Sequence, residues 1–486
     1  MARLVARALR LGRSALLQTG ATVAYRGGYR LSYLMPALVW PGPLVLVVPE
    51  TIHQHLLQDV IPHLLETLPT IKSIQVGDRW PDGDFQGILV TTPQAWLAAQ
   101  LSPEADALFP KTIVTLFDGI DSLADWIREQ LTCRLDSTAW QQLNLAYPGQ
   151  RNVFDTIRVR LTRSGLQRPT NPYGCYLLDQ DEHQQLLDLF AHLSETALGL
   201  ECLPPIWARF HRRFSSENAM VWLRLHRDSG QISLCCAPVD LAAVMAPVWE
   251  RQPLVLVGAA VDADPRASIY RQQLGLGDLT CLKFGPDRHQ EGVQLYAPDR
   301  LPMPNSSQFS QAVLQETRSL LQLPEARTQL TVIIVGDSPL KNQVGSILAA
   351  EYGSRVQVER ERLAANGILV TGWEFWLDYR LRCPAPVMTI VVTLPIPSLE
   401  NPLVAARVSY HKRLRQDWFR LFLLPAALQT LQLAIAPTCA RQGKVALLDN
   451  RINHRSYGRV LLDAIAPTAQ TSYLDETWLA PINQQI

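Results

Sequence analysis

Residues 27–57 read GGYRLSYLMPALVWPGPLVLVVPETIHQHLL, and they give the clearest indication of the fold class. A glycine pair, Gly27 and Gly28, precedes a helical run. Between Pro43 and Pro49 lies a short run of Leu and Val, which is typical of a strand buried on both faces of a parallel sheet. A glycine turn, a helix and a buried strand in this order predict an α/β domain.

Similar apolar runs, bounded by turn residues, recur along the 486-residue chain. We predict buried strands within residues 43–49, 87–92, 112–117, 253–261, 330–336, 367–371, 388–395 and 444–449. Helical patterns lie between most of them, for example at residues 51–68, 308–323 and 340–352. Strands that alternate with helices imply doubly wound parallel sheets, so the predicted fold class is α/β with two parallel-sheet lobes.

Residues 122–213 interrupt this alternation. They lack a convincing series of strands and carry helical periodicity, so we predict a helical insertion in the first lobe. The proline-rich stretch YAPDRLPMPN, residues 296–305, breaks regular structure and marks the main domain boundary. The predicted division is a first lobe in two parts, an insertion and a second lobe, at residues 1–121 with 214–300, 122–213 and 301–486.

The composition is that of a globular chain, with 47% hydrophobic residues and 18% charged residues against the usual ~25%. A formal net charge of +1 argues neither for nor against nucleic-acid binding. The eight cysteines form no C-x-x-C pair, so we expect reduced thiols, no metal site and a cytoplasmic protein. The arginine-rich N-terminus also fits a transit peptide. We expect no membrane-spanning segment, because prolines break the best apolar stretch, residues 31–48.

The glycine turn has the position, but not the chemistry, of a phosphate-binding loop. Such a loop reads [AG]-x-x-x-x-G-K-S/T, because its lysine reaches the terminal phosphates and its hydroxyl holds magnesium. Here Tyr29 stands at the lysine position, Arg30 at the hydroxyl position and Val23 at the leading small residue. The residues that could still hold an anion are Arg26, Gly27, Gly28, Tyr29 and Arg30. We therefore expect ATP with magnesium to bind poorly at best.

Several further segments follow one another in an order that resembles one family. They are LYAPDRLPMPN at 295–305, LPIPSLENPL at 394–403, LPAA at 424–427 and ALLDNR at 446–451, followed by Tyr457-Gly458. Together with the glycine turn, this order resembles the DinG/XPD-type DNA helicases of superfamily two, over roughly residues 11–467. The resemblance implies two RecA-like lobes, nucleic acid as a partner and an ATP-driven motor.

The resemblance places a second catalytic segment at IVTLFDGID, residues 113–121. The family has D-E-A-H here, in which the aspartate orients magnesium and the glutamate activates the attacking water. This chain keeps Asp118, with Asp121 nearby, but Gly119 replaces the glutamate and cannot act as a base. A strand that simply ends in a polar turn would give the same pattern.

Other motor groups that the resemblance implies are missing. The family motif Q-x-x-G-R-x-x-R supplies arginines that stabilise the γ-phosphate across the cleft between the lobes. This chain has QLAIAPTCAR at residues 432–441, which leaves Arg441 as the candidate finger. The coupling segment VGAAV, residues 257–261, lacks the family's hydroxyls. No cysteine lies within residues 51–118, where the family carries the ligands of its iron–sulfur cluster, so no iron–sulfur cluster is expected.

A basic and aromatic segment at residues 405–420, AARVSYHKRLRQDWFR, is the candidate nucleic-acid surface. Basic side chains neutralise phosphates and aromatic rings stack on bases. The candidate residues are Arg407, Lys412, Arg413, Arg415, Trp418 and Arg420. The alternative is a helix with a solvated basic face and a buried aromatic face. Single-stranded DNA or another nucleic acid is the predicted partner.

Three functions fit the sequence. The leading hypothesis is a helicase-like, nucleic-acid-binding protein that has lost efficient ATP hydrolysis. The second is an active ATP-dependent DNA helicase in which Arg26 or Arg30 contacts phosphate, Asp118 or Asp121 holds magnesium and Arg441 is the finger. The third is an unrelated two-lobed α/β protein, such as a sugar-nucleotide enzyme with its site between the lobes.

Overall fold

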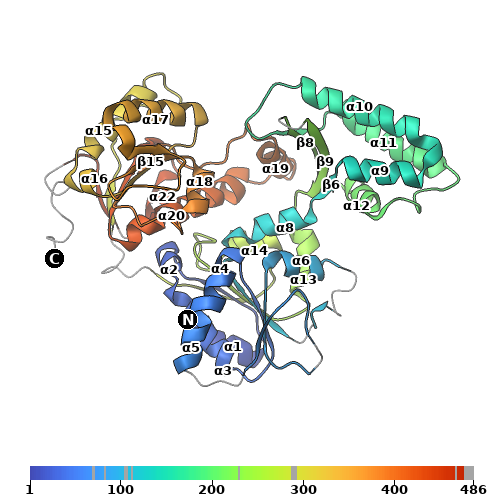
Figure 1. The fold of residues 1–486 in the computed structure, drawn as a ribbon, viewed down its shortest axis with the longest axis horizontal. Coiled ribbons are helices and arrows are strands. Elements are labelled where there is room, and N and C mark those ends of the chain that lie inside the picture. The colour runs from blue at the N-terminus through green and yellow to red at the C-terminus, as the bar shows by residue number, and fades with distance from the viewer. Residues whose placement is uncertain are drawn as a thin grey trace.

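The structure is a computed structural model that describes residues 1–67, 72–81, 84–102, 108–110, 113–227, 230–285, 293–465 and 468–474. Two parallel sheets of seven strands each form two lobes, and a smaller antiparallel sheet belongs to the insertion (Figure 1). The α/β prediction with two parallel-sheet lobes is confirmed. Each of the eight predicted strands lies in one of the two parallel sheets.

Lobe 1 is built on a sheet with the strand order β11-β1-β10-β5-β2-β4-β3. All of its neighbouring strands are parallel, and its central strands are buried on both faces, as their unbroken apolar sequences require. The strands are β1 (Ala15–Gln18), β2 (Leu44–Val47), β3 (Ile74–Val76), β4 (Ile88–Thr91), β5 (Val114–Asp118), β10 (Leu254–Gly258) and β11 (Thr280–Lys283).

The helices of lobe 1 cover both faces of this sheet (Figure 1). They are α1 (Ala2–Leu11), α2 (Ala21–Arg26), α3 (Leu31–Val39), α4 (Glu50–His55), α5 (Ile61–Thr67), α6 (Pro93–Gln100), α8 (Leu123–Leu131), α13 (Ala242–Trp249) and α14 (Ser268–Leu274). Shorter turns are η1 (Gly28–Arg30), the π-helical η2 (Leu56–Val60) and η3 (Ile120–Ser122).

The insertion contains a sheet as well as the predicted helices. Its antiparallel order is β6-β9-β8-β7, and the long hairpin of β8 and β9 pairs with two short strands from the helical region. The elements are β6 (Cys133–Leu135), α9 (Ser137–Ala146), η4 (Pro148–Gln150), α10 (Arg151–Gln167), β7 (Cys175–Leu177), α11 (Gln180–Glu195), α12 (Pro205–Phe214), β8 (Ala219–His226) and β9 (Gln231–Pro238). The boundary predicted at residue 213 is therefore wrong, because it separates this hairpin from its partner strands. The boundary predicted after residue 121 is also wrong, because Leu123, Ile127 and Leu131 of α8 pack in the core of lobe 1.

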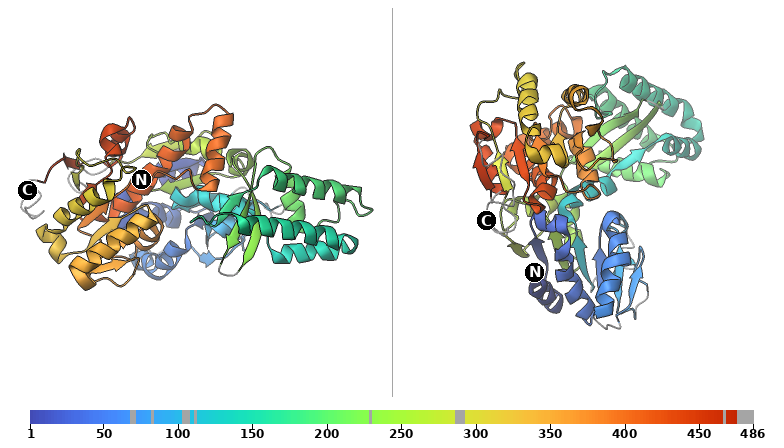
Figure 2. Two further views of the ribbon diagram at one scale, coloured as in Figure 1. Left: turned by 90° about the horizontal axis from the view of Figure 1, so that it is seen from above. Right: turned by 60° about the vertical axis from the view of Figure 1, so that its left-hand side comes forward.

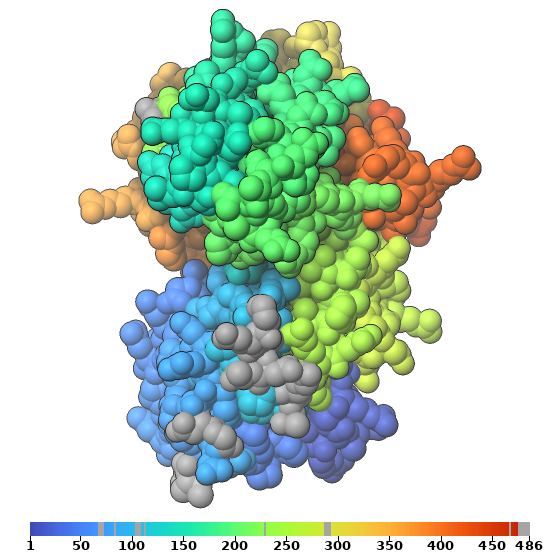
Figure 3. Space-filling model, turned by 90° about the vertical axis from the view of Figure 1, so that its right-hand side faces the viewer, coloured from blue at the N-terminus to red at the C-terminus, as the bar shows by residue number. Residues whose placement is uncertain are grey.

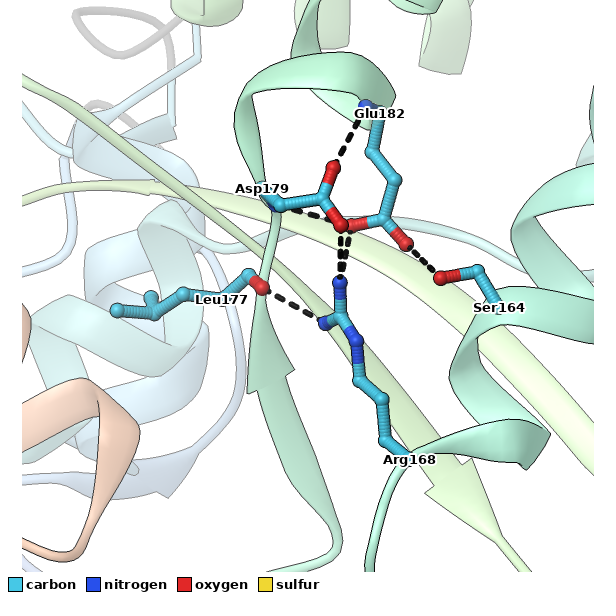
Figure 4. Close-up of polar contacts among 5 residues, drawn as sticks. All are labelled: Ser164, Arg168, Leu177, Asp179 and Glu182. Atoms are coloured by element: carbon cyan, nitrogen blue, oxygen red, sulfur yellow. Dashed lines mark hydrogen bonds and ion pairs between the residues drawn. The ribbon is translucent and has the colours of Figure 1, made fainter.

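Arg168 ties the helices of the insertion to its sheet (Figure 4). Its guanidinium donates to Glu182 at 2.6 Å, to Asp179 at 3.0 Å and to the carbonyl of Leu177 at 2.8 Å. Asp179 and Glu182 form a capping box at the start of α11, and Ser164 of α10 donates to Glu182 at 2.6 Å. Glu182 is only 3% exposed, so these donors replace the water that its carboxylate has lost.

Replacing Arg168 with methionine is expected to destabilise the insertion by about 2–4 kcal/mol, because Glu182 stays buried without its cation. Urea unfolding followed by tryptophan fluorescence would measure the change. The matched control is Arg151→Met, since Arg151 and Asp155 pair at 3.6 Å with both side chains at least half exposed. The control should cost less than about 0.5 kcal/mol, and an equal loss in both variants would contradict the role of the network.

Lobe 2 is built on a parallel sheet with the order β14-β15-β13-β16-β17-β12-β18. Its first strand pairs with β17 and β18, so lobe 2 already includes residues 293–296. The boundary predicted after residue 300 is wrong, because the proline-rich stretch follows this strand instead of preceding it. The strands are β12 (Val293–Tyr296), β13 (Thr331–Ile334), β14 (Val356–Val358), β15 (Ile368–Thr371), β16 (Met388–Val391), β17 (Lys444–Leu447) and β18 (Thr468–Thr471).

The helices of lobe 2 include one that is apolar on all sides, α20, which continues the π-helical turn η6. The elements are α15 (Phe309–Leu321), α16 (Pro324–Thr328), α17 (Ser338–Tyr352), η5 (Gly353–Arg355), α18 (Trp373–Tyr379), α19 (Pro402–Arg413), η6 (Phe419–Leu423), α20 (Leu424–Ala440), α21 (Arg451–His454) and α22 (Gly458–Ile465).

The helix Phe419–Ala440 is long and apolar enough to cross a membrane by length and composition, with a mean hydropathy of 1.5. The prediction that residues 31–48 are the best apolar stretch is therefore wrong, since Pro425 and Pro437 do not interrupt this longer helix. In the structure α20 packs on β16 and β17 of its own lobe and on α2 of lobe 1. These contacts bury part of the helix, and 44% of its most apolar 18-residue window lies inside the structure.

The chain thus forms three parts, lobe 1, the insertion and lobe 2. Lobe 2 and the insertion lie side by side above lobe 1 (Figures 1 and 2). Figure 3 shows the insertion, in teal and green, standing on lobe 1, in blue. Helix α19 of lobe 2 contacts β7 of the insertion, where Leu403 and Ala406 pack against Trp222 and its neighbours. Lobe 2 is therefore in contact with lobe 1 through α20 and with the insertion through α19.

Candidate functional site

The candidate nucleotide site lies at the carboxyl ends of three adjacent strands, β1, β10 and β5. Gln18, Gly258 and Asp118 are the last residues of these strands. In an open parallel sheet, ligands bind beyond the carboxyl ends of the strands. The predicted phosphate loop and the aspartate predicted to orient magnesium therefore lie at the same edge of the lobe 1 sheet.

The segment after β1 is not an open loop. The amides of Thr19 and Gly20 donate to the carbonyls of Gly258 and Ala259 at 2.8 and 2.9 Å. Helix α2 begins directly afterwards and ends at Gly27, whose φ of 74° is the left-handed conformation that favours glycine. The candidate anion-binding residues Arg26, Gly27, Gly28, Tyr29 and Arg30 thus form a helix end and a tight turn.

Asp118 is fully buried, and its carboxylate is occupied by side chains of the neighbouring turn and helix. The hydroxyl of Tyr29 donates to Oδ1, and the hydroxyl of Tyr33 donates to Oδ2 at 2.8 Å. Arg30 Nε also donates to Oδ2, at 3.1 Å. The two residues that replace the lysine and the hydroxyl of a phosphate loop therefore bind the aspartate that would orient magnesium.

The charges around Asp118 balance without a metal ion. Burial alone would lower the pKa of Arg30, but Tyr29 and Asp118 outweigh it and raise that pKa, so the guanidinium stays charged. A magnesium ion would have to displace Arg30 and would meet its positive charge. Tyr29 also occupies the position of the lysine that binds phosphate in a phosphate loop. The residues present therefore do not fit bound ATP with magnesium.

Gly119 explains why the missing base cannot be restored by one substitution. Its φ is 78°, and a Cβ atom there would approach the ring of Pro49 at 3.0 Å. A glutamate at this position would need a left-handed backbone and a shift of Pro49. The backbone of this turn is therefore built around glycine.

Backbone amides bind the carboxylate of Asp121. Its two carboxylate oxygens accept hydrogen bonds from the amides of Ala259 at 2.7 Å and Ala260 at 2.8 Å. Burial raises the pKa of Asp121, and these amides oppose burial only in part. The side chain thus links the end of β5 to the coupling segment at residues 257–261, where the family's hydroxyls are missing.

Tyr33 gives this cluster a pH dependence. Burial, followed by the charge of Asp118, raises the pKa of Tyr33 well above 10.0, and the same causes act on Tyr29. Unfolded tyrosines ionise near pH 10, whereas the folded ones stay neutral to higher pH. Their contribution is therefore complete below pH ~10 and is lost as the pH rises toward the folded pKa.

Urea unfolding between pH 8 and pH ~11 should thus show a fall in stability that is shallower in Tyr33→Phe. At pH 8 the same variant should be less stable by about 1–3 kcal/mol, because a charged hydrogen bond is lost. The control Tyr473→Phe removes a hydroxyl from a 65% exposed ring and should change neither value. Equal pH profiles for all three proteins would show that the cluster is not as described.

The cleft between the lobes is bridged next to this cluster. Helix α2 packs on α20, and Arg26 donates to the carbonyl of Ala440 at 2.8 Å. Gln429 of α20 donates to the carbonyl of Asp121 at 2.8 Å. The segment that would hold phosphates in a motor is thus part of the interface between the lobes.

The candidate finger Arg441 is held within its own lobe. It donates to the carbonyl of Ala385 at 2.7 Å and to the side chain of Gln329. Sequence reasoning missed another arginine, Arg380, at the end of α18. Burial lowers the pKa of Arg380, and the charge of Asp121 in lobe 1 opposes this effect. The motif FWLDYR gave no signal for this interaction.

The structure divides the candidate nucleic-acid residues into two groups. Lys412, Arg413, Arg415 and Arg420 are exposed after the middle of α19, while Trp418 is half-buried beneath Lys412, whose Nζ lies 5.3 Å from its ring. Arg407 instead lies 4.8 Å over the ring of Phe422 and lines a cavity between the lobes. The exposed group agrees with both a nucleic-acid surface and a solvated basic face.

Among the described residues, no group of three or more His, Cys, Asp or Glu is placed to hold a metal ion.

No protein-family model matches the chain. The chain is 20% identical over 286 residues to the 3'-5' exonuclease DinG of Bacillus subtilis, which covers 54% of this chain and 31% of that protein. It is 21% identical over 316 residues to the ATP-dependent DNA helicase YoaA of Haemophilus influenzae, which covers 60% of this chain and 49% of that protein. The chain thus spans no more than about half the length of these curated relatives.

Among solved structures, the chain is similar to XPD in its apo form. The TM-score is 0.59 at 12% identity, and the match covers 97% of this chain and 99% of that one. This match confirms the two RecA-like lobes. Together with the sequence matches, it confirms the resemblance to DinG/XPD-type helicases of superfamily two.

Proposed function

We propose that this chain, which resembles the DinG/XPD-type helicases, is a helicase-like protein that binds nucleic acid and does not hydrolyse ATP efficiently. It keeps the two-lobed scaffold of a motor, and its exposed basic residues at the end of α19 are suited to a phosphate backbone. Single-stranded DNA is the proposed partner. Such a protein would act in nucleic-acid transactions by binding, without strand separation driven by ATP.

One observation carries the loss of hydrolysis. The Asp118 carboxylate is bound by Tyr29, Arg30 and Tyr33, so the acid that would orient magnesium is neutralised from within the chain. The general base is replaced by Gly119 in a left-handed turn. Since each motor group of this kind accelerates phosphoryl transfer by orders of magnitude, their joint loss supports a binding role.

The alternative of an active helicase with substituted residues is less well supported. Each arginine that it would use already has a partner in the chain. Arg30 binds Asp118, Arg26 binds the carbonyl of Ala440, and Arg441 binds Ala385 and Gln329. An active enzyme would need to break these contacts in every cycle.

Two assays on the purified chain test the proposal. Fluorescence anisotropy with a labelled oligo(dT) should show saturable binding that weakens steeply with salt, by a slope of about −0.7 for each phosphate contacted. Hydrolysis of ATP in the presence of the same oligonucleotide should equal the background rate. If the oligonucleotide stimulates ATP turnover and Asp118→Ala abolishes it, the proposed loss of hydrolysis is wrong. If the oligonucleotide does not bind, the proposed binding role is wrong.

A further inference from the structure

A cavity of about 380 Å³ lies where lobe 1, the end of the insertion and lobe 2 meet. Its walls come from α8 and α14 of lobe 1, from residues 239–242 after β9, and from α19 to α20 of lobe 2. This volume is at the lower end of the range for small-ligand sites, ~300–1,000 Å³. It is separate from the Asp118 cluster, since Tyr29, Arg30 and Tyr33 do not line it.

Two arginines from different lobes line this cavity, Arg128 of α8 and Arg407 of α19. Arg128 donates from Nη1 to Asp125 at 3.2 Å, but the Asp125 side chain is 82% exposed and its charge is screened by water. The Nε atom of Arg128 is buried and has no hydrogen-bond partner among the described residues. Its hydrogen-bonding capacity is therefore only partly used.

Arg407 also donates few hydrogen bonds to the chain. Within the described part of the chain, its one hydrogen bond runs from Nε to the carbonyl of Leu403 at 3.3 Å, and its guanidinium rests over the ring of Phe422. Burial, reinforced by the charge of Arg128 and opposed in part by that of Asp125, lowers the pKa of Arg407 to about 9. Two cations thus line one cavity, and the exposed Asp125 offsets their charge only in part.

The remaining charged groups of the cavity do not supply that charge. Asp121 accepts from the amides of Ala259 and Ala260, and Asp240 accepts from the amide of Ala242 at 2.9 Å. His411 is paired with Gln416 at 2.7 Å. Planar guanidinium groups bind the oxygens of phosphate in a bidentate way, which would satisfy both arginines at once.

We propose that Arg128 and Arg407 together bind a phosphate group in this cavity, as a phosphodiester of a single strand or as part of a small phosphate ligand. The phosphodiester form rests on the proposed nucleic-acid binding, whereas the small-ligand form does not. Because the two arginines belong to different lobes, phosphate would also hold the lobes together through this cavity.

The test uses the full chain with Arg128→Gln, Arg407→Gln and Arg407→Lys, and with Arg362→Gln as a matched control. Arg362 is exposed between β14 and β15 and does not line the cavity. The probes are labelled oligo(dT), pyrophosphate and AMP. Each glutamine variant should weaken binding of the probe that uses the cavity by about 10-fold. Arg407→Lys should weaken this binding less, because lysine keeps the charge but loses the bidentate geometry.

If a phosphodiester is bound, each glutamine variant should also reduce the salt slope for oligo(dT) by about 0.7. Melting temperatures should not fall in Arg407→Gln, since its like-charge repulsion is relieved. If the variants leave oligo(dT) binding unchanged and neither small probe binds, this inference is overturned and the proposed function stays intact. Arginine-dependent binding of pyrophosphate or AMP without oligo(dT) binding would support the small-ligand form and overturn the proposed function.

Discussion

Replacing Arg30 with methionine should destabilise lobe 1 by about 3–5 kcal/mol, because the change removes one partner of a buried ion pair. Asp118 is fully buried and the Arg30 side chain is 14% exposed, so water cannot replace the lost cation. Tyr29 and Tyr33 would still donate to Asp118, but two neutral donors do not cancel a full negative charge. Urea unfolding at pH 8 gives the free energy of unfolding of both proteins.

The second substitution Asp118→Asn separates this explanation from a general packing defect. In the double variant the buried charge is gone, so most of the stability lost in Arg30→Met should return. Arg7→Met removes an exposed arginine of α1 and should cost less than about 0.5 kcal/mol. If the double variant were as unstable as Arg30→Met alone, the ion pair would not be the cause.

The second large effect is expected in lobe 2 for Lys444→Met. Lys444 is the first residue of β17 and is fully buried, and its Nζ lies 3.2 Å from Glu325 of α16. The other oxygen of Glu325 is buried without a hydrogen-bond partner. Removing the lysine should therefore cost about 3–5 kcal/mol, as for other broken buried pairs.

The same urea titration checks this value, and the double variant Lys444→Met with Glu325→Met supplies the control. Removing both charges should recover most of the loss, since apolar residues of similar volume can replace a buried pair at little cost. A double variant less stable than Lys444→Met would mean that Glu325 stabilises lobe 2 by itself. Salt should change neither result much, because buried pairs are poorly screened.

The sequence predicted the central strands of both lobes because runs such as LVLV at residues 44–47 alternate with helical patterns, as strands buried on both faces of a parallel sheet do. It missed β1 in lobe 1 and all four strands of the insertion, the long β8 and β9 as well as the short β6 and β7. Length does not explain these misses, because β2 was predicted with four residues and β8 was missed with eight. The three residues of β6 give no periodicity of their own, and they form a strand because β9 pairs with them.

The candidate site was predicted in part. The missing lysine, hydroxyl and base were visible as Tyr29, Arg30 and Gly119, but their new contacts were not. Tyr29 and Tyr33 are four residues apart, and this spacing could have placed both hydroxyls on one helix face toward the buried aspartate. Arg407 lines a cavity while its basic neighbours stay exposed. This difference depends on how α19 packs on the insertion, which no local sequence pattern predicts.

The most direct test of the central claim, that the chain's own side chains occupy the nucleotide site at Asp118, is calorimetric titration of the unmodified chain with ATP and magnesium. We predict no saturable binding tighter than about 1 mM, which corresponds to a binding free energy of about −4 kcal/mol. Saturable binding at about 10 μM or tighter that disappears in Asp118→Asn would show that Arg30 and the two tyrosines yield to the metal and phosphates, and would contradict the claim.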